Sequence, residues 1–140
     1  MLPLRLVLDT NILVSAALKP DSLQRTVLTL ATTKPGRLYV SHAILDEYAE
    51  VLARSELGIR KGLRLQLLQL INDHSYGVAP SRILNVTNDP DDNIFIECAD
   101  AARADYLVTG NQRHFPAFWK QTKIITAREF VTLAAPHLIR

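Results

Sequence analysis

Leu4-Arg5-Leu6-Val7-Leu8-Asp9-Thr10-Asn11-Ile12-Leu13-Val14 is the stretch that decides the fold. An apolar run that stops at an acid and a polar pair, and then resumes, predicts a strand, a tight turn and a helix. In an open α/β sheet, ligands bind at the carboxyl ends of the strands. Asp9 is therefore expected at a ligand-binding edge, where a rigid, partly buried carboxylate can hold a cation. The simpler alternative is that Asp9 or Asn11 only caps the following helix.

The rest of the chain alternates predicted strands with predicted helices. Strands are expected at 4–8, 37–40, 77–79, 106–109 and 123–125, and helices at about 12–18, 23–33, 42–54, 63–74, 90–103 and 127–135. Strands that alternate with helices indicate a mostly parallel sheet that is covered on both faces. The sequence therefore predicts one α/β domain over residues 1–140, a three-layer α/β/α structure with a mostly parallel central sheet of about five strands.

Composition narrows the class of protein. The chain has 140 residues, of which 48% are hydrophobic and 21% charged, as in an ordinary globular protein. Its single cysteine, Cys98, excludes a disulfide framework and a cysteine-rich zinc site, and its apolar neighbours predict a buried, inert thiol. No apolar stretch approaches the roughly 20 residues of a membrane span, and the amino terminus lacks a secretory signal pattern. A cytoplasmic protein without membrane contact is expected.

The two signs of charge are unevenly distributed, although the net charge is only +2. Six of the fourteen acids lie in one short segment: Asp89, Asp91, Asp92, Glu97, Asp100 and Asp105. Basic residues gather elsewhere, for example between 54 and 64. A concentrated acidic segment could bind a polyanion through a metal ion. For the basic cluster, a solvated helical face is the simpler explanation.

Two further acids could join Asp9. Glu47 falls at the border of the apolar stripe of its predicted helix, from which it could reach a cleft, although a plain surface glutamate is the alternative. Asp89 and Asp91 are explained as the cap and the first-turn acid of the next helix, but capping does not require Asp92. Three carboxylates that meet above strand ends would form a hard-cation site suited to Mg²⁺. Such a site can activate a water molecule and neutralise the charge of a phosphodiester.

Other common sites are not indicated. The four histidines have no spacing suited to zinc, although His42 and His114 could contact phosphate near the expected site. The chain contains neither a glycine-rich phosphate loop nor a serine nucleophile elbow. A phosphohydrolase that uses Asp9 as nucleophile, as in haloacid-dehalogenase-like enzymes, remains an alternative. That class usually has a second aspartate two residues on, where this chain has Asn11.

The chain resembles the PIN-domain nucleases, and among them the toxin components of toxin–antitoxin pairs. The similarity rests on four motifs in series over almost the whole chain: Val7–Ser15, Ser41–Tyr48 with Val51-Leu52, Asp89–Asn93 with Phe95–Ala99, and Asp105–Asn111 ahead of His114-Phe115. It implies a parallel sheet with helices on both sides and a Mg²⁺- or Mn²⁺-dependent ribonuclease. It also implies RNA as substrate and a cognate antitoxin as partner.

The resemblance assigns a role to each matching position. The family acids fall on Asp9, Glu47 and Asp92, which become the expected catalytic residues and metal ligands. The fourth metal position, usually aspartate, is Asn111 here, which keeps an oxygen ligand but removes one negative charge. Supporting roles fall on the following residues: Thr10, Asn11, Asp91 and Thr109.

The sequence allows two explanations both for the activity of the protein and for its leucine-rich segment. Because Asn111 replaces an acid, a weakly active or inactive PIN domain that binds RNA or protein is the alternative to a ribonuclease. The leucine-rich segment 63–71 has more apolar residues than one core-facing stripe needs. The surplus could form a homodimer interface or receive an antitoxin helix, but a helix buried within the monomer explains the same pattern.

Overall fold

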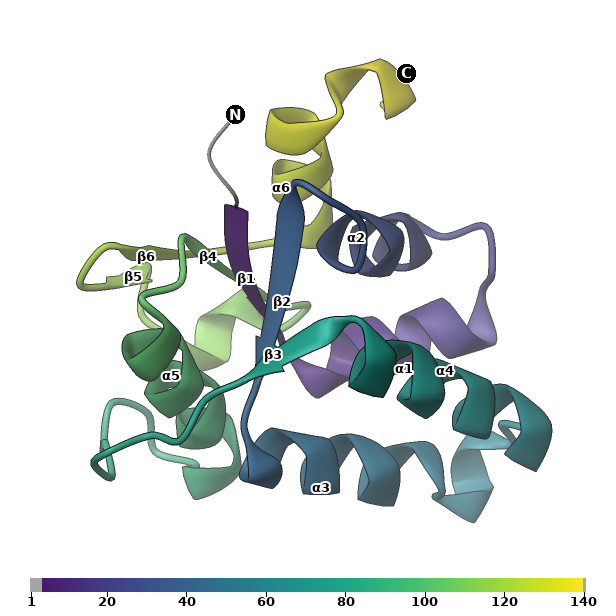
Figure 1. Ribbon diagram of the computed structural model, residues 1–140, viewed down its shortest axis with the longest axis horizontal. Helices are drawn as coiled ribbons and strands as arrows, with labels where there is room; N and C mark the ends of the chain where they lie inside the picture. The colour runs from purple at the N-terminus through teal and green to yellow at the C-terminus, as the bar shows by residue number, and fades with distance from the viewer. Residues whose placement is uncertain (1–3, 140) are drawn as a thin grey trace.

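The computed structural model describes residues 4–139 and shows a six-stranded, mostly parallel sheet in the order β3-β2-β1-β4-β6-β5 (Figure 1). The strands are β1 Leu4–Leu8, β2 Gly36–Val40, β3 Ser75–Gly77, β4 Tyr106–Val108, β5 Phe118–Trp119 and β6 Thr122–Ile125. All neighbouring strands pair in parallel except β5, which runs antiparallel to β6. The parallel strands therefore bring their carboxyl ends to the same edge of the sheet.

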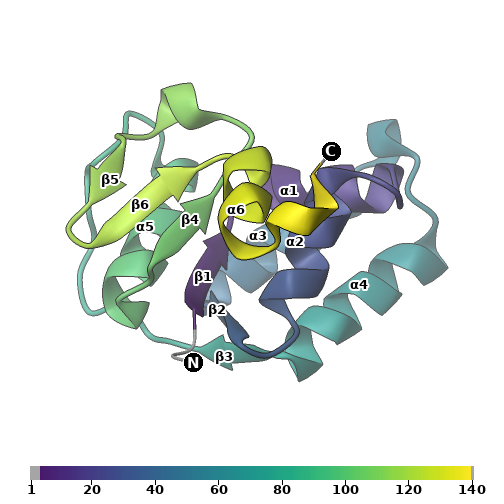
Figure 2. The same ribbon diagram turned by 90° about the horizontal axis from the view of Figure 1, so that it is seen from above.

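Helices cover both faces of this sheet. They are α1 Thr10–Leu18, α2 Leu23–Ala31, α3 His42–Leu52, α4 Lys61–Asp73, α5 Pro90–Ala102 and α6 Ala127–Ala134. Short 3₁₀ turns lie at Ser55–Leu57, Gln112–His114 and Pro136–Leu138. Figure 2 shows α5 on one side of the sheet and α1, α2, α4 and α6 on the other. This arrangement confirms the predicted α/β fold with helices on both sides of a mostly parallel sheet.

Side-chain caps start most of the helices where the sequence predicts. The hydroxyls of Ser22 and Ser41 accept backbone N–H groups of α2 and α3, and Asp89 caps α5 ahead of Pro90. Thr126 and Glu129 form a reciprocal capping box at α6. Each cap satisfies a backbone N–H that the helix itself leaves unpaired, which fixes where the chain leaves a strand and enters a helix.

The core is centred on β1. Leu6, Val7 and Leu8 are fully buried, since β1 lies between β2 and β4 and is covered on both faces. A strand that is buried on both faces has a continuous apolar sequence, which is why Leu6-Val7-Leu8 shows no alternation with polar residues. The hydroxyl of Tyr48, on α3, donates a hydrogen bond to the carbonyl of Leu8. α3 is thereby attached to the end of the central strand.

Two details of the sheet differ from the prediction. β5 was not predicted, because two residues are too few to show a period and the strand follows Pro116 closely. The short strand expected at 77–79 begins two residues earlier, at Ser75. Its residues pair with β2 at the edge of the sheet, where burial is weak and the apolar signal is correspondingly small.

The leucine-rich helix α4 uses most of its apolar side chains within the protein. Leu67 and Ile71 are buried, and three more leucines of this helix pack partly against the core. Leu65 is the exception, with 49% of its surface exposed. Burial within the monomer therefore explains most of the predicted surplus. No helix among residues 4–139 is both long and apolar enough to cross a membrane.

Candidate active site

Asp9 directly follows β1, and three hydrogen bonds hold its carboxylate in a single orientation. Its Oδ1 accepts the Thr10 N–H at 2.7 Å, while Oδ2 accepts the Thr109 hydroxyl at 2.7 Å and the Asn11 amide at 3.2 Å. Only 6% of the residue is exposed. Asp9 is also the N-cap of α1. The capping and the ligand-binding interpretations are thus compatible, because the cap occupies one oxygen and leaves lone pairs on the carboxylate.

The end of β4 supplies the main support for Asp9. Thr109 is fully buried, and its hydroxyl accepts the Asn111 N–H at 2.9 Å while it donates to Asp9. The N–H of Gly110 donates to the Asn11 carboxamide at 3.0 Å. A Cβ at Gly110 would lie 3.3 Å from that carboxamide oxygen, so the close approach favours glycine. The loops after β1 and β4 are in this way joined by side-chain to backbone bonds.

Glu47 reaches the same edge of the sheet from α3. Its Oε2 accepts the hydroxyl of Thr10 at 3.2 Å, and Thr10 is the residue whose N–H binds Asp9. Thr10 therefore bridges the two carboxylates. Glu47 is partly exposed at the border of the buried helix stripe, as its position in the sequence predicts. The structure does bring Glu47 next to the Asp9 turn.

Asp92 approaches from the first turn of α5. Its side chain is 17% exposed, and its Oδ2 lies 3.6 Å from Nδ1 of His114. Asp92 is also close enough to Asp9 for the charge of Asp9 to raise its pKa. Four separate segments thus converge here: the end of β1, α3, the start of α5 and the turn after β4.

All three acids resist ionisation in the folded protein. Burial is the largest cause that raises the pKa of Asp9, opposed by its hydrogen bonds and by His114. Burial also raises the pKa of Glu47, with a contribution from the nearby charge of Asp91. For Asp92, burial comes first and the charges of Asp9 and Asp89 add to it. Carboxylates that are crowded and partly desolvated favour a bound proton or a bound cation.

The donor set therefore fits a hard divalent cation, which prefers carboxylate and carbonyl oxygens. Within residues 4–139, no three His, Cys, Asp or Glu side chains are already arranged to hold a metal ion. Coordination by Asp9, Glu47 and Asp92 together would require their carboxylates to close around the ion. Asp9 is the fixed member of the group, because its orientation is set by three donors.

Most of the acidic segment 89–105 has other roles, so the predicted concentration of charge is dispersed in the structure. Asp89 caps α5, and Glu97 accepts the N–H of Leu84 at 3.0 Å. Asp105 accepts the N–H of Arg5 at 2.8 Å. A helix directs successive acids to different sides, so nearness along the sequence does not place them in one site. Of this segment, Asp92 is the acid whose pKa is raised by Asp9.

The remaining predicted site residues lie at the rim. The Asn111 side chain is exposed and lines a polar hollow with Arg113 and His114, and its backbone reaches the acids only through Thr109. Asp91 is exposed beside Glu47. Cys98 is buried as predicted, and burial raises its thiol pKa to about 12, which makes it a poor nucleophile.

One supporting residue was not recognised from the sequence. Tyr48 was predicted only as part of the apolar stripe, whereas its hydroxyl holds α3, and with it Glu47, against β1. A tyrosine in an otherwise apolar stripe is itself a signal, because a buried phenol needs a hydrogen-bond partner. The sequence does not show which carbonyl that partner is.

The raised pKa values of the three acids predict how the stability of the metal-free protein depends on pH. A carboxyl group whose pKa is raised by folding contributes stability that is present below its unfolded pKa and is lost as pH rises through the folded value. We therefore expect the melting temperature in EDTA to fall as the pH rises above about 4, the usual carboxyl pKa of the unfolded chain. Asp92→Asn should make this slope shallower. Parallel slopes for the two proteins would show that Asp92 is not perturbed by burial and Asp9.

Comparison with known proteins identifies the family. An α/β fold with acids gathered at the carboxyl ends of its central strands is found in several classes of metal-dependent hydrolase. Residues 5–113 match the PIN domain family, and the chain belongs to it. All four expected metal positions lie within the matched residues.

The chain is also similar to one further protein in sequence and to one solved structure in fold. It is 29% identical over 113 residues to the uncharacterized protein MJ1680 of Methanocaldococcus jannaschii, which covers 78% of this chain and 72% of that protein. Its fold is similar to the crystal structure of VapBC2 from Rickettsia felis bound to a DNA fragment from their promoter, with a TM-score of 0.60. That match has 19% identity and covers 88% of this chain and 98% of the other. At this identity the likeness concerns the fold alone.

Proposed function

We propose that the protein is an endoribonuclease that hydrolyses RNA phosphodiester bonds with the help of Mg²⁺ or Mn²⁺. The observation that carries this proposal is the Asp9 carboxylate, which is buried, held by three donors and close to Asp92 at the carboxyl end of the central strand. Membership of the PIN domain family supports it, since the family consists in general of nucleases. Asp9, Glu47 and Asp92 would hold the cation.

Each residue has a definite part in this proposal. A bound divalent cation would supply an activated water and neutralise charge on the phosphodiester. Asp9 provides the fixed ligand, because Thr109 and the Thr10 N–H set its orientation. Thr10 also holds Glu47 through its hydroxyl, so that one residue positions two acids. Asn11 keeps the turn after β4 close to Asp9 through its bond to Gly110.

The alternative is a PIN domain that binds RNA or protein without cleavage. Asn111 favours this alternative, because it reduces the negative charge at the fourth expected metal position. Its side chain is exposed, and its link to the acids runs from its backbone N–H through Thr109. As partners we propose a cognate antitoxin, which the sequence resemblance implies, and a second copy of this chain. The structural likeness to VapBC2 is consistent with a protein partner of this kind.

A cleavage assay tests the proposal. The purified protein is incubated with 5′-labelled single-stranded and hairpin RNAs in Mn²⁺, Mg²⁺ or EDTA, beside Asp9→Asn purified in the same way. We expect internal cuts that require the metal and are absent with the variant. Cuts that persist in EDTA, or at equal rates with Asp9→Asn, would exclude this site as their source. RNA binding without any cleavage would favour the alternative.

Asn111→Asp should strengthen metal binding. An added carboxylate near a divalent ion is attracted to it more than it repels its screened neighbours, so the Mn²⁺ concentration for half-maximal activity should fall roughly two- to tenfold. The metal-free variant should lose some stability through crowding of like charges. Calorimetric titration of both proteins with Mn²⁺ measures the affinity directly. Equal affinities would place residue 111 outside the coordination sphere.

A further inference from the structure

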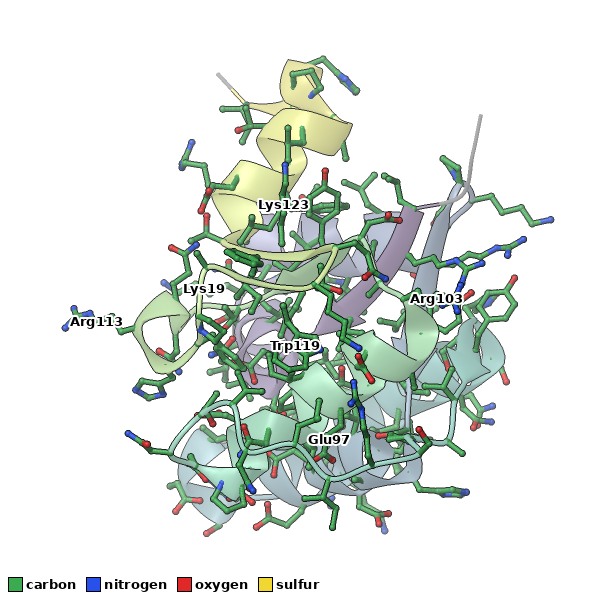
Figure 3. All side chains as sticks on the ribbon, turned by 90° about the vertical axis from the view of Figure 1, so that its left-hand side faces the viewer. Lys19, Glu97, Arg103, Arg113, Trp119 and Lys123 are labelled. Atoms are coloured by element: carbon green, nitrogen blue, oxygen red, sulfur yellow. The ribbon has the colours of Figure 1, made fainter. Side chains whose placement is uncertain are left out.

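A polar cavity of about 610 Å³ lies between the second half of α5, the loop that precedes it and the β5–β6 turn. Its polar and charged lining residues are Ser81, Arg82, Asp100, Arg103, Lys120 and Gln121. Figure 3 looks onto this face of the molecule, where Arg103 and Trp119 are labelled beside α5. None of these residues takes part in the acidic site described above.

The cavity carries an excess of positive charge. Asp100 pairs with Lys120 at 2.9 Å and with Arg82 at 3.4 Å, and it accepts the indole N–H of Trp119 at 3.1 Å. The hydrogen bond from Lys120 is the largest cause that lowers the pKa of Asp100, to about 2. Arg103 forms no ion pair among the described side chains. Three cations thus face one carboxylate, which leaves a local charge of +2.

The backbone conformation at residue 103 does not favour an arginine. Arg103 ends α5 in the left-handed conformation, with φ of 50°, where glycine is the favoured residue. Lys120, in the turn on the opposite wall, also has a positive φ of 52°. Two long cationic side chains therefore line the cavity at positions where the backbone conformation favours glycine.

The cavity lies at a useful distance from the acids. α5 rises about 1.5 Å per residue, so Asp100 and Arg103 lie about 12 and 16 Å along the helix from Asp92. A single RNA strand spans that length with a few nucleotides. Its backbone is a chain of phosphates, and phosphate contacts from Arg and Lys dominate the affinity of proteins for nucleic acids.

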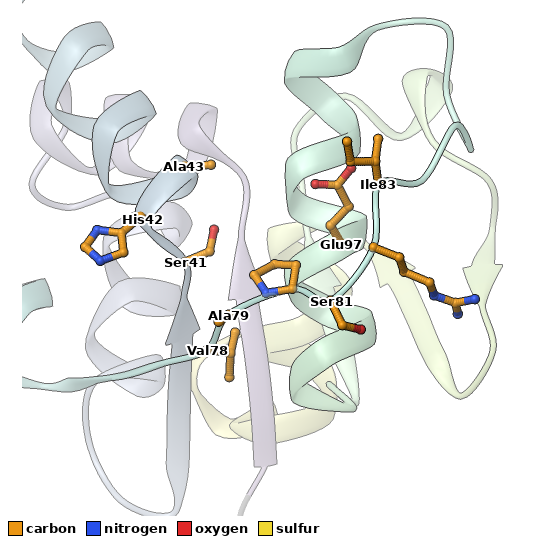
Figure 4. A pocket seen from close by; sticks show the side chains of 10 residues that line it. Ser41, His42, Ala43, Val78, Ala79, Ser81, Ile83 and Glu97 are labelled. Atoms are coloured by element: carbon orange, nitrogen blue, oxygen red, sulfur yellow. The ribbon is translucent and has the colours of Figure 1, made fainter.

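An adjoining hollow favours a nucleotide over an acidic peptide. Arg82 and Ser81 also line a second hollow of about 400 Å³, whose walls include the apolar side chains of Val78, Ala79 and Ile83 (Figure 4). Ser41, His42 and Glu97 also line this hollow, but most of its wall is apolar. A mostly apolar hollow beside a cationic one matches a nucleotide, which has an apolar base face next to a charged phosphate. An acidic peptide would use the cations alone.

We propose that Arg82, Arg103 and Lys120 bind a backbone phosphate of single-stranded RNA, a few nucleotides away from the bond that is cut. The inference rests on the proposed ribonuclease function for the identity of the ligand. The cavity then acts as an anchor: it increases the affinity for long substrates without touching the reacting phosphate. Asp100 orients two of the cations, Arg82 and Lys120, through its ion pairs with them.

Binding in EDTA tests the anchor separately from catalysis. The probe is a fluorescein-labelled single-stranded RNA 12-mer of mixed sequence, followed by anisotropy against the full chain at several salt concentrations. The variants are Arg103→Gly, which suits the left-handed backbone, and Lys120→Asn. The matched control is Arg128→Gln, which removes an exposed cation from α6.

We expect each cavity variant to bind the 12-mer about fivefold more weakly at 0.1 M salt, and the slope of log K against log salt to decrease by about 0.7. Binding of the 12-mer by Arg128→Gln should match the wild type. The melting temperature of Arg103→Gly should stay equal or rise, since its backbone is relieved, so a structural role cannot explain a loss of affinity.

Three results would overturn the inference. They are unchanged 12-mer affinity in Arg103→Gly, an equal loss of affinity in the Arg128→Gln control, or binding of a labelled oligoglutamate peptide to this face without binding of the 12-mer. If the cavity variants weaken 12-mer binding but no RNA is cut in Mn²⁺, the anchor stands and the proposed ribonuclease function fails. The two claims are therefore separable in one set of proteins.

Discussion

Asp9→Asn and Asp92→Asn should each reduce the rate of metal-dependent RNA cleavage by at least about a hundredfold, because metal assistance contributes several kcal/mol to such reactions. Each substitution removes one of three expected ligand charges while the volume of the side chain hardly changes. Initial rates in saturating Mn²⁺, measured on the same labelled RNA, give the comparison. Cleavage at the wild-type rate by both variants would refute the metal-nuclease proposal.

The stability of these two variants serves as the control. Asp9→Asn replaces one acceptor oxygen by an NH₂ group, which costs about 1 kcal/mol in a lost hydrogen bond, but it also removes a buried charge. Asp92→Asn also removes a largely buried charge, but it does not cost a hydrogen bond of this kind. We therefore expect melting temperatures in EDTA within about 5 °C of the wild type, and a small rise for Asp92→Asn. A large fall in either would mean that lost activity reports unfolding.

Thr109→Val should reduce both stability and activity. The Thr109 hydroxyl donates to the buried Asp9 carboxylate and accepts the Asn111 N–H, so an isosteric valine leaves two polar groups without this partner. Because one of them is charged, we expect a loss of about 2–3 kcal/mol in the free energy of unfolding. Activity should fall roughly ten- to a hundredfold, as is typical when a residue that orients a metal ligand is removed.

Thr122→Val provides a matched control. Thr122 is equally buried, but its hydroxyl donates to the neutral carbonyl of Ala104, away from the acids. Its loss should cost about 1 kcal/mol of stability and leave the specific activity unchanged. Urea unfolding and initial cleavage rates measure both effects. If the two variants lose activity in proportion to stability, Thr109 has only a structural role.

The sequence predicts well those features that depend on local pattern. The strand that ends at Asp9, the helix that Ser41 caps and the helix that begins after Asp89 are found within a few residues of their expected positions. Glu47 could be placed at the edge of the buried stripe because helical periodicity fixes which residues share a face. These positions follow from propensity, capping and burial within one element.

The features that local patterns do not show depend on contacts between segments far apart in the chain. Thr109 and Asp9 are 100 residues apart, and the partner of the Tyr48 hydroxyl lies 40 residues away, on β1. Local patterns carry no information about such pairings, which are set by strand order. The dispersal of the acids between 89 and 105 has the same origin, since each finds a different partner in the folded chain. The family resemblance supplied the site residues where local reasoning could not rank them.

The double role of Asp9 has a consequence for how such a protein can evolve. Asp9 both caps α1 and supplies the fixed carboxylate of the candidate site. Asparagine caps a helix about as well as aspartate, but it carries no charge. A single substitution could therefore remove cation binding while it preserves the first helix and, with it, the architecture. Descendants of this chain could therefore lose the proposed hydrolysis and keep the proposed partner surfaces, with little change in shape.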